Sequence, residues 1–156
     1  MDWMDGAWAP LTTGWPEALL RFAASIVLPL LIGVERYLRK KPIDFRPFVI
    51  ISVAACGLAF AGLELAERAS DPQLRIDPTR IFAGVITGIS FLGAGAMFRR
   101  DGHVQGAGSA AAVWAAGTVG LLCGCGFLWL AGIVSVAVLV LLAASRPFTA
   151  DYDAEE

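Results

Sequence analysis

The chain has 156 residues, of which 57% are hydrophobic and 17% charged, and its net charge is −2. Soluble domains usually carry about 25% charged residues, so this composition argues against a water-soluble fold, and the acidic balance excludes the basic surface of a nucleic-acid-binding protein. Residues 104–145 form an uncharged run of 42, and residues 81–98 form another of 18. Because about 20 apolar residues cross a bilayer as a helix, we expect an all-α membrane protein.

In chain order, residues 1–16 come first and contain Trp3, Trp8 and Trp15. Tryptophan favours the membrane–water interface, so we expect this segment to lie along it. Five transmembrane helices follow, predicted at residues 17–34, 47–66, 79–98, 106–123 and 127–144. The last two divide the run of 42, which as one helix would be about 63 Å long, twice the hydrocarbon thickness. Residues 147–156 are expected to be a short, disordered acidic tail.

The basic residues predict the orientation of these helices. Most of them follow the first, third and fifth predicted spans: Arg36, Arg39, Lys40, Lys41, Arg46, Arg99, Arg100 and Arg146. On the other side, acidic residues balance the basic ones: Glu64, Glu67, Asp71 and Asp77 against Arg68, Arg75 and Arg80. The positive-inside rule therefore places the N-terminus outside and the C-terminus in the cytoplasm.

Two groups of charged residues are candidate functional sites. Glu35 and Arg36 end the first span, and with Arg46 they predict a charge network on the cytoplasmic side, or else a plain interfacial salt bridge that stops the helix. At the other end Asp77 precedes a proline, which predicts an N-cap for the third helix, and with Thr79 and Arg80 it is a possible polar anchor. The acidic residues near it suit a hydrated Mg²⁺, but the interleaved arginines favour a mixed solvated loop.

Glycines concentrate in the third and fourth spans. The set proposed for helix packing is Gly84, Gly88, Gly93, Gly95 and Gly106. The spacing of Gly84 and Gly88, repeated at Gly120 and Gly124, lets two helix backbones approach closely. The spacing leaves two interpretations open: tight packing within one chain, or a subunit interface or cavity lined by backbone.

No catalytic constellation is evident. Ser109 and His103 invite comparison with an intramembrane serine protease, but helical geometry would point the two apart. Cys56, Cys123 and Cys125 lie in apolar segments and are expected to pack as small hydrophobes. Arg21 lies four residues after Glu17, which predicts a helical pair or a side chain that reaches to the interface. Because no catalytic constellation is evident, we expect no enzymatic activity and no cofactor.

In order along the chain, several blocks resemble the MgtC/SapB family of bacterial inner-membrane proteins. These blocks are residues 32–36 (IGVER), Arg46 with its following span, residues 77–81 (DPTRI) leading to 88–95 (GISFLGAG), and residues 106–114 (GAGSAAAVW). The resemblance covers roughly residues 18 to 145. The chain departs from the family pattern at Pro47, Gly84, Gly108 and Ser109, where the family commonly has more polar residues, so a site built from those groups would be altered here.

The resemblance implies a place in the bacterial inner membrane and a role in adaptation to low magnesium or in virulence. It also implies modulation of other membrane proteins, among them the ATP synthase. The first hypothesis is therefore a non-enzymatic regulator that acts by helix–helix contact. A homo-oligomer is compatible with this hypothesis. The alternative is a small oligomeric transporter or channel for Mg²⁺ or another solute.

Overall fold

The structure is a computed structural model that describes residues 9–38, 44–68, 77–100 and 103–144. The described elements are α1 (Trp15–Leu38), α2 (Arg46–Arg68), α3 (Pro78–Gly95), β1 (Phe98–Arg100), β2 (His103–Gln105), α4 (Ala107–Gly124) and α5 (Leu128–Ala144). The helical fold class and the five helices predicted from the apolar runs are thus confirmed.

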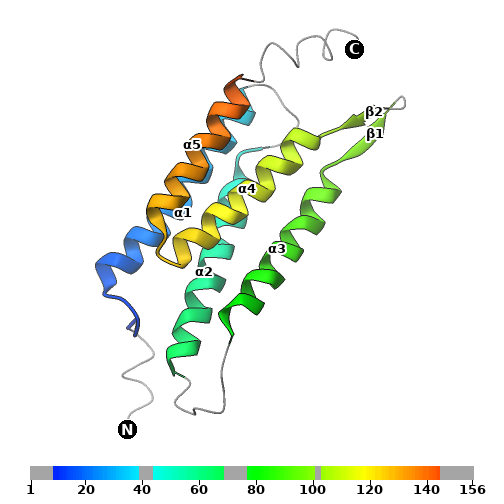
Figure 1. Ribbon diagram of the computed structural model, residues 1–156. Helices are drawn as coiled ribbons and strands as arrows, with labels where there is room; N and C mark the ends of the chain where they lie inside the picture. The colour runs from blue at the N-terminus through cyan, green and yellow to red at the C-terminus, as the bar shows by residue number, and fades with distance from the viewer. Residues whose placement is uncertain (1–8, 39–43, 69–76, 101–102, 145–156) are drawn as a thin grey trace.

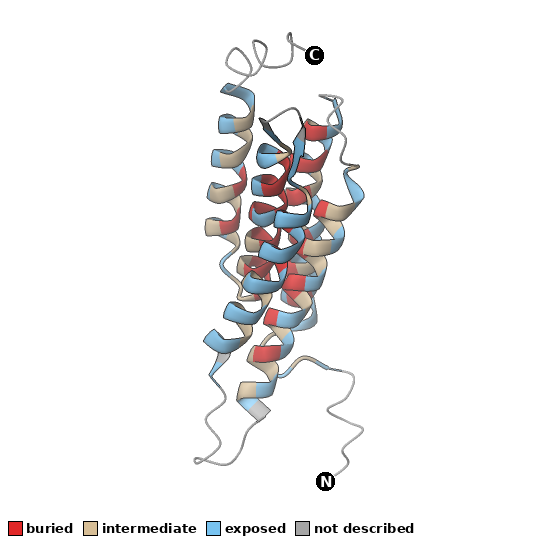
Figure 2. Ribbon diagram, turned by 90° about the vertical axis from the view of Figure 1, so that its right-hand side faces the viewer, coloured by how far each residue is buried: buried red, intermediate tan, exposed pale blue. Residues whose placement is uncertain are grey.

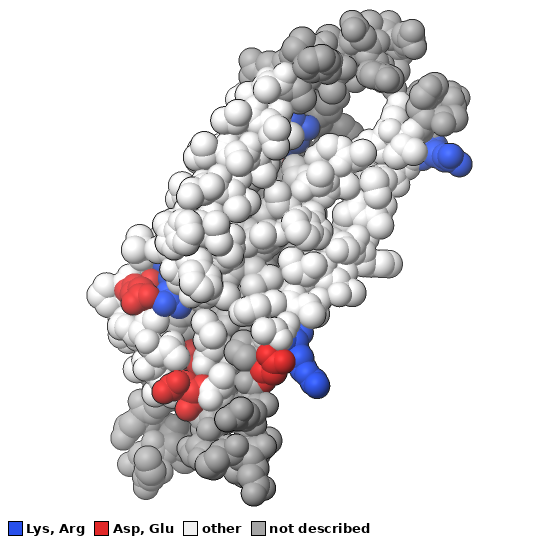
Figure 3. Space-filling view, viewed as in Figure 1, with Lys and Arg blue, Asp and Glu red and all other residues white. Residues whose placement is uncertain are grey.

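Three of the described helices are long and apolar enough to cross a membrane: Trp15–Leu38, Arg46–Glu67 and Ala107–Gly124. The segments Thr79–Gly95 and Leu128–Ala144 are apolar but shorter. Consecutive helices run in alternating directions along one bundle (Figure 1). In the visible face of the described residues, charged side chains lie toward the ends and a broad uncharged surface separates them (Figure 3).

Helix α4 is the centre of the bundle. It contacts all four other helices, and its longest contact is with α2. Of its 18-residue apolar window 67% is buried, against 33% for α1 and for α2, and Figure 2 shows the buried residues concentrated in the interior of the bundle. Alanine and glycine dominate its sequence, and such small residues allow neighbouring helices to approach it from several sides.

Glycines set the closest helix contacts. A Cβ on Gly120 would overlap the backbone of Ser52, and a Cβ on Gly124 would overlap the carbonyl oxygen of Cys56, both on α2. On its other side, Gly117 accommodates the side chain of Ile89 from α3. Gly117, Gly120 and Gly124 are therefore packing positions within one chain.

The segment between α3 and α4 corrects one prediction. The third span was expected to continue to Phe98, but α3 ends at Gly95 and residues 98–100 pair with residues 103–105 as an antiparallel hairpin. The uncharged run continues through Phe98 without marking the end of the helix, because hairpin pairing is not visible in hydropathy. Helix α4 begins after Gly106, whose φ of 85° favours glycine.

The first predicted segment is also shorter than expected, because Trp15 and Pro16 are the first residues of α1. Proline is favoured in the first turn of a helix, where its missing N–H costs nothing. The predicted acidic tail lies outside the described residues. So do several of the charged loop residues that predict the orientation of the helices: Arg39, Lys40, Lys41, Asp71, Arg75 and Arg146.

Candidate functional site

Glu35 and Arg36 lie near the C-terminal end of α1, where it meets the first turn of α4. Arg36 Nε donates to Glu35 Oε2 over 2.8 Å, and the two side chains are 7% and 14% exposed, respectively. Arg36 Nη1 lies 3.6 Å from the position that a Cβ on Gly108 would take. Arg36 thus connects the Glu35 carboxylate on α1 to the first turn of α4.

Arg46 forms a separate pair. Its guanidinium donates to the carboxylate of Asp44, and its own side chain is 75% exposed. This hydrogen bond from Arg46 is the main reason that the pKa of Asp44 lies below its usual value. The predicted network of Glu35, Arg36 and Arg46 is thus divided between a buried pair on α1 and an exposed pair at the start of α2.

Asp77 is the N-cap of α3, as the Asp-Pro order predicts. Its Oδ1 accepts hydrogen bonds from the amide of Thr79 over 2.9 Å and from the Thr79 hydroxyl over 2.7 Å. These bonds to the charged form hold the pKa of Asp77 below its usual value. Arg80 is exposed and donates its backbone N–H to the Asp77 carbonyl. Within the described ranges, no group of three or more His, Cys, Asp or Glu side chains is placed to hold a metal ion.

The predicted packing glycines have different surroundings. Gly84, Gly88 and Gly95 are exposed on α3, and a Cβ on any of them would meet no described atom within 4 Å. Gly93 is buried, with the carbonyl oxygen of Ala110 at 3.5 Å from its Cβ position, and Gly106 lies against the backbone of Ala96. We call Gly84, Gly88 and Gly95 the glycine face of α3; it points away from the bundle.

Arg21 makes a contact that the sequence did not indicate. The predicted pair with Glu17 is present, and Arg21 also donates from Nη1 to the carbonyl oxygen of Gly124 over 3.0 Å. Its guanidinium lies 5.7 Å from the centre of the Phe60 ring, and the residue is only 8% exposed. Arg21 therefore satisfies a free carbonyl at the C-terminal end of α4. The available signal was an arginine within an apolar span, which needs a polar partner.

Ser109 is buried in the first turn of α4, and residue 103 is on β2 with its backbone paired to Arg100. The side chain of His103 lies outside what the structure describes. No described contact joins Ser109 to residue 103, so the comparison with an intramembrane serine protease, which helical geometry already disfavoured, gains no support.

Together the fold and these sites define an α-helical membrane protein with a small-residue central helix and a buried arginine near each end of the bundle, Arg21 and Arg36. The model of the MgtC family matches residues 22–150, and the chain belongs to that family. This agrees with the resemblance seen in the sequence blocks.

Three relatives illustrate the similarity. An uncharacterized protein of Haemophilus influenzae is 35% identical over 83% of this chain and 57% of its own length. Protein SapB of Bacillus subtilis is 32% identical over 72% of this chain and 49% of its own length. Protein MgtC of Brucella abortus is 32% identical over 90% and 54%. The chain thus spans about half the length of these relatives. No solved structure matches it significantly.

Proposed function

We propose that this chain is a non-enzymatic membrane protein that acts through helix–helix contact, using the glycine face of α3. The supporting observation is that Gly84, Gly88 and Gly95 share one helix face and have no described neighbour within 4 Å of a Cβ position. Glycine in a helix costs about 1 kcal/mol relative to alanine, and among the described residues no close contact at these positions offsets that cost. A partner helix could approach closely at this face and gain dispersion energy.

The proposal includes five membrane crossings, with the N-terminus outside and the C-terminus in the cytoplasm. At 1.5 Å per residue, the 18 residues of α3 and the 17 of α5 extend about 27 and 26 Å. These lengths are close to the hydrocarbon thickness of about 30 Å. Both helices contact α4, one of the three longer apolar helices, over a substantial length. The positive-inside distribution of basic residues supports the direction.

We place the protein in the bacterial inner membrane, with a role in adaptation to low magnesium or in virulence-associated homeostasis. Family membership supports this role, and the ATP synthase is a partner suggested by the same resemblance. A second copy of the chain is another partner that the glycine face could accommodate, since an isologous contact needs one self-complementary surface.

The test is a Gly88→Leu variant, in which a large side chain blocks the glycine face. The matched control is Gly132→Leu on α5, because a Cβ on Gly132 also meets no described atom within 4 Å. Partners that co-purify after cross-linking in membranes, and growth at low magnesium, are measured for both variants. We expect Gly88→Leu to lose the cross-linked partner and the growth advantage, and Gly132→Leu to retain both.

Unchanged growth and cross-linking in Gly88→Leu would contradict the proposal. The competing function, a small oligomeric transporter or channel, is tested by reconstitution into liposomes that contain a Mg²⁺ indicator. Mg²⁺ flux that depends on the protein and is absent from empty liposomes would show that the protein is a transporter or channel, and the regulatory proposal would be rejected.

A further inference from the structure

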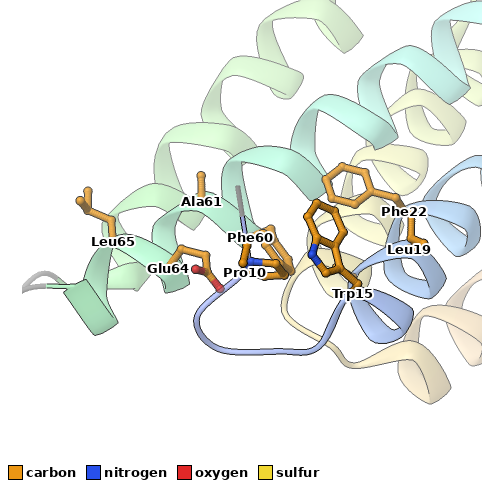
Figure 4. A pocket seen from close by; sticks show the side chains of 10 residues that line it. Pro10, Trp15, Leu19, Phe22, Phe60, Ala61, Glu64 and Leu65 are labelled. Carbon is orange, nitrogen blue, oxygen red and sulfur yellow. The ribbon is translucent and has the colours of Figure 1, made fainter. Parts of the chain in front are cut away.

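A cavity lies at the end of the bundle where α1 begins, between α1, α2 and residues 9–14, which we call the N-terminal strap. Its volume is about 570 Å³, within the range of roughly 300–1,000 Å³ typical of ligand sites. Figure 4 shows the strap running past the cavity, with Trp15 and Phe22 of α1 on one side and Phe60 and Glu64 of α2 on the other.

The strap is held by one carboxylate of α2. Glu64 Oε2 accepts the backbone N–H of Leu11 over 2.7 Å, and Glu64 Oε1 accepts the N–H of Thr12 over 2.9 Å and also the Thr12 hydroxyl. The Glu64 side chain is thereby directed to the strap. Among the described residues that line the cavity, Glu64 is the only charged one, so the rest of this lining suits an apolar ligand.

The aromatic wall of the cavity is fixed by its neighbours. The rings of Phe22 and Phe60 are in contact, with centroids 6.0 Å apart. The Arg21 guanidinium lies over the Phe60 ring, and Arg21 is itself held by Gly124. The aromatic wall is therefore held in place through Arg21 by the C-terminal end of α4. Such support from neighbouring residues is what a preorganised binding site requires.

The cavity opens onto the flank of two helices that are apolar enough to cross a membrane, α1 and α2. Its rim is apolar and exposed: Trp15 is 57% exposed, Leu19 63% and Leu65 53%. This rim continues the surface that the bilayer covers, while tryptophan favours the interfacial level. The molecules that meet such an opening are lipids, and an acyl chain matches both the apolar lining and the lateral entry.

We propose that this cavity binds one acyl chain of a phospholipid from the leaflet at which α1 begins, with the N-terminal strap closing it off at that end of the bundle. The headgroup stays outside the cavity and is not recognised, since the carboxylate at its edge is engaged by the strap. The inference stands independently of the function proposed for the glycine face.

The experiment uses Ala61→Phe, because Ala61 lines the cavity and is exposed, so that a ring can enter the space. The matched control is Ala54→Phe, an exposed position on α2 outside the lining. The full chain is placed in vesicles that contain phosphatidylcholine or phosphatidylglycerol with a nitroxide on the acyl chain, and immobilised lipid per chain is counted by electron paramagnetic resonance. We expect one fewer immobilised lipid in Ala61→Phe, no change in Ala54→Phe, and the same result with both headgroups.

A second variant, Glu64→Ala, releases the strap without filling the cavity, and it should also lower the number of immobilised lipids. If Ala61→Phe fails to fold, the lipid count of Glu64→Ala alone tests whether the cavity binds an acyl chain. Equal loss in Ala61→Phe and Ala54→Phe, or no loss in either cavity variant, would overturn the proposal. So would binding of phosphatidylglycerol alone, which would indicate headgroup recognition. A gain of one lipid on deletion of residues 2–8 would show that the chain's own N-terminal segment is the occupant.

Discussion

Alanine at Gly120 and alanine at Gly88 should have opposite effects on stability, although both glycines are in apolar helices. At Gly120 the added Cβ overlaps three backbone atoms of Ser52, so α2 and α4 must move apart. Overpacking of this kind costs about 1–3 kcal/mol, and backbone neighbours favour the upper end. Alanine's better helix propensity offsets about 1 kcal/mol, which leaves a net loss of roughly 2 kcal/mol.

At Gly88 the added methyl group meets no described atom within 4 Å, so only the propensity term remains. The free energy of unfolding should therefore rise by up to about 1 kcal/mol. The two variants should differ by about 3 kcal/mol in total. This difference is measurable as a shift of the unfolding midpoint when purified protein in mixed micelles is titrated with denaturing detergent and followed by far-ultraviolet circular dichroism.

Equal stability of the two variants would refute the close approach of α2 and α4 at Ser52. A destabilised Gly88→Ala variant would instead mean that the glycine face of α3 is packed within the chain. Because Gly88→Ala is expected to keep the fold, any loss of growth at low magnesium in that variant reports on the surface rather than on stability.

Three further predictions concern the charged groups. Arg21→Gln should lower the free energy of unfolding by about 1.5–3 kcal/mol, the value of a hydrogen bond from a charged donor, whereas Glu17→Gln should cost less than about 1 kcal/mol because that carboxylate is largely exposed. Because its folded-state pKa is lowered, Asp77 should stabilise α3 fully above the usual aspartate pKa of about 4 and lose this effect as pH falls through the lowered value; in Asp77→Asn, which can still cap, amide exchange of α3 should lack that step. Arg36→Gln should lower the free energy of unfolding by about 1.5–3 kcal/mol, because it removes a hydrogen bond between two charged and buried side chains, whereas Arg46→Gln, at an exposed pair, should cost less than about 1 kcal/mol; chemical unfolding of the two variants compares them directly.

Features that depend on neighbouring residues were predictable. The Asp-Pro order specified the cap at Asp77, and the spacing of four specified the pair of Glu17 with Arg21. Both follow from helix geometry alone. The hairpin after α3 was missed, because its pairing joins residues across a turn and the apolar run continues through Phe98.

Contacts between distant segments were not predictable. Arg21 meets a carbonyl oxygen 103 residues away, and Arg46 pairs with Asp44 rather than joining Glu35. Glu64 and the strap residues that it holds are more than 50 residues apart in the sequence. No local rule selects such partners, since each depends on how the helices are placed around α4.

The sequence by itself determined that this chain is a helical membrane protein and where its apolar helices lie, because crossing a bilayer demands apolar length and satisfied backbone hydrogen bonds. Tertiary structure alone decided what its glycines do. Gly84 and Gly88 have the same spacing as Gly120 and Gly124, yet the first pair is open and the second lies against the backbone of α2. Spacing places residues on one face of a helix, but only the packing of the other helices determines whether that face is covered.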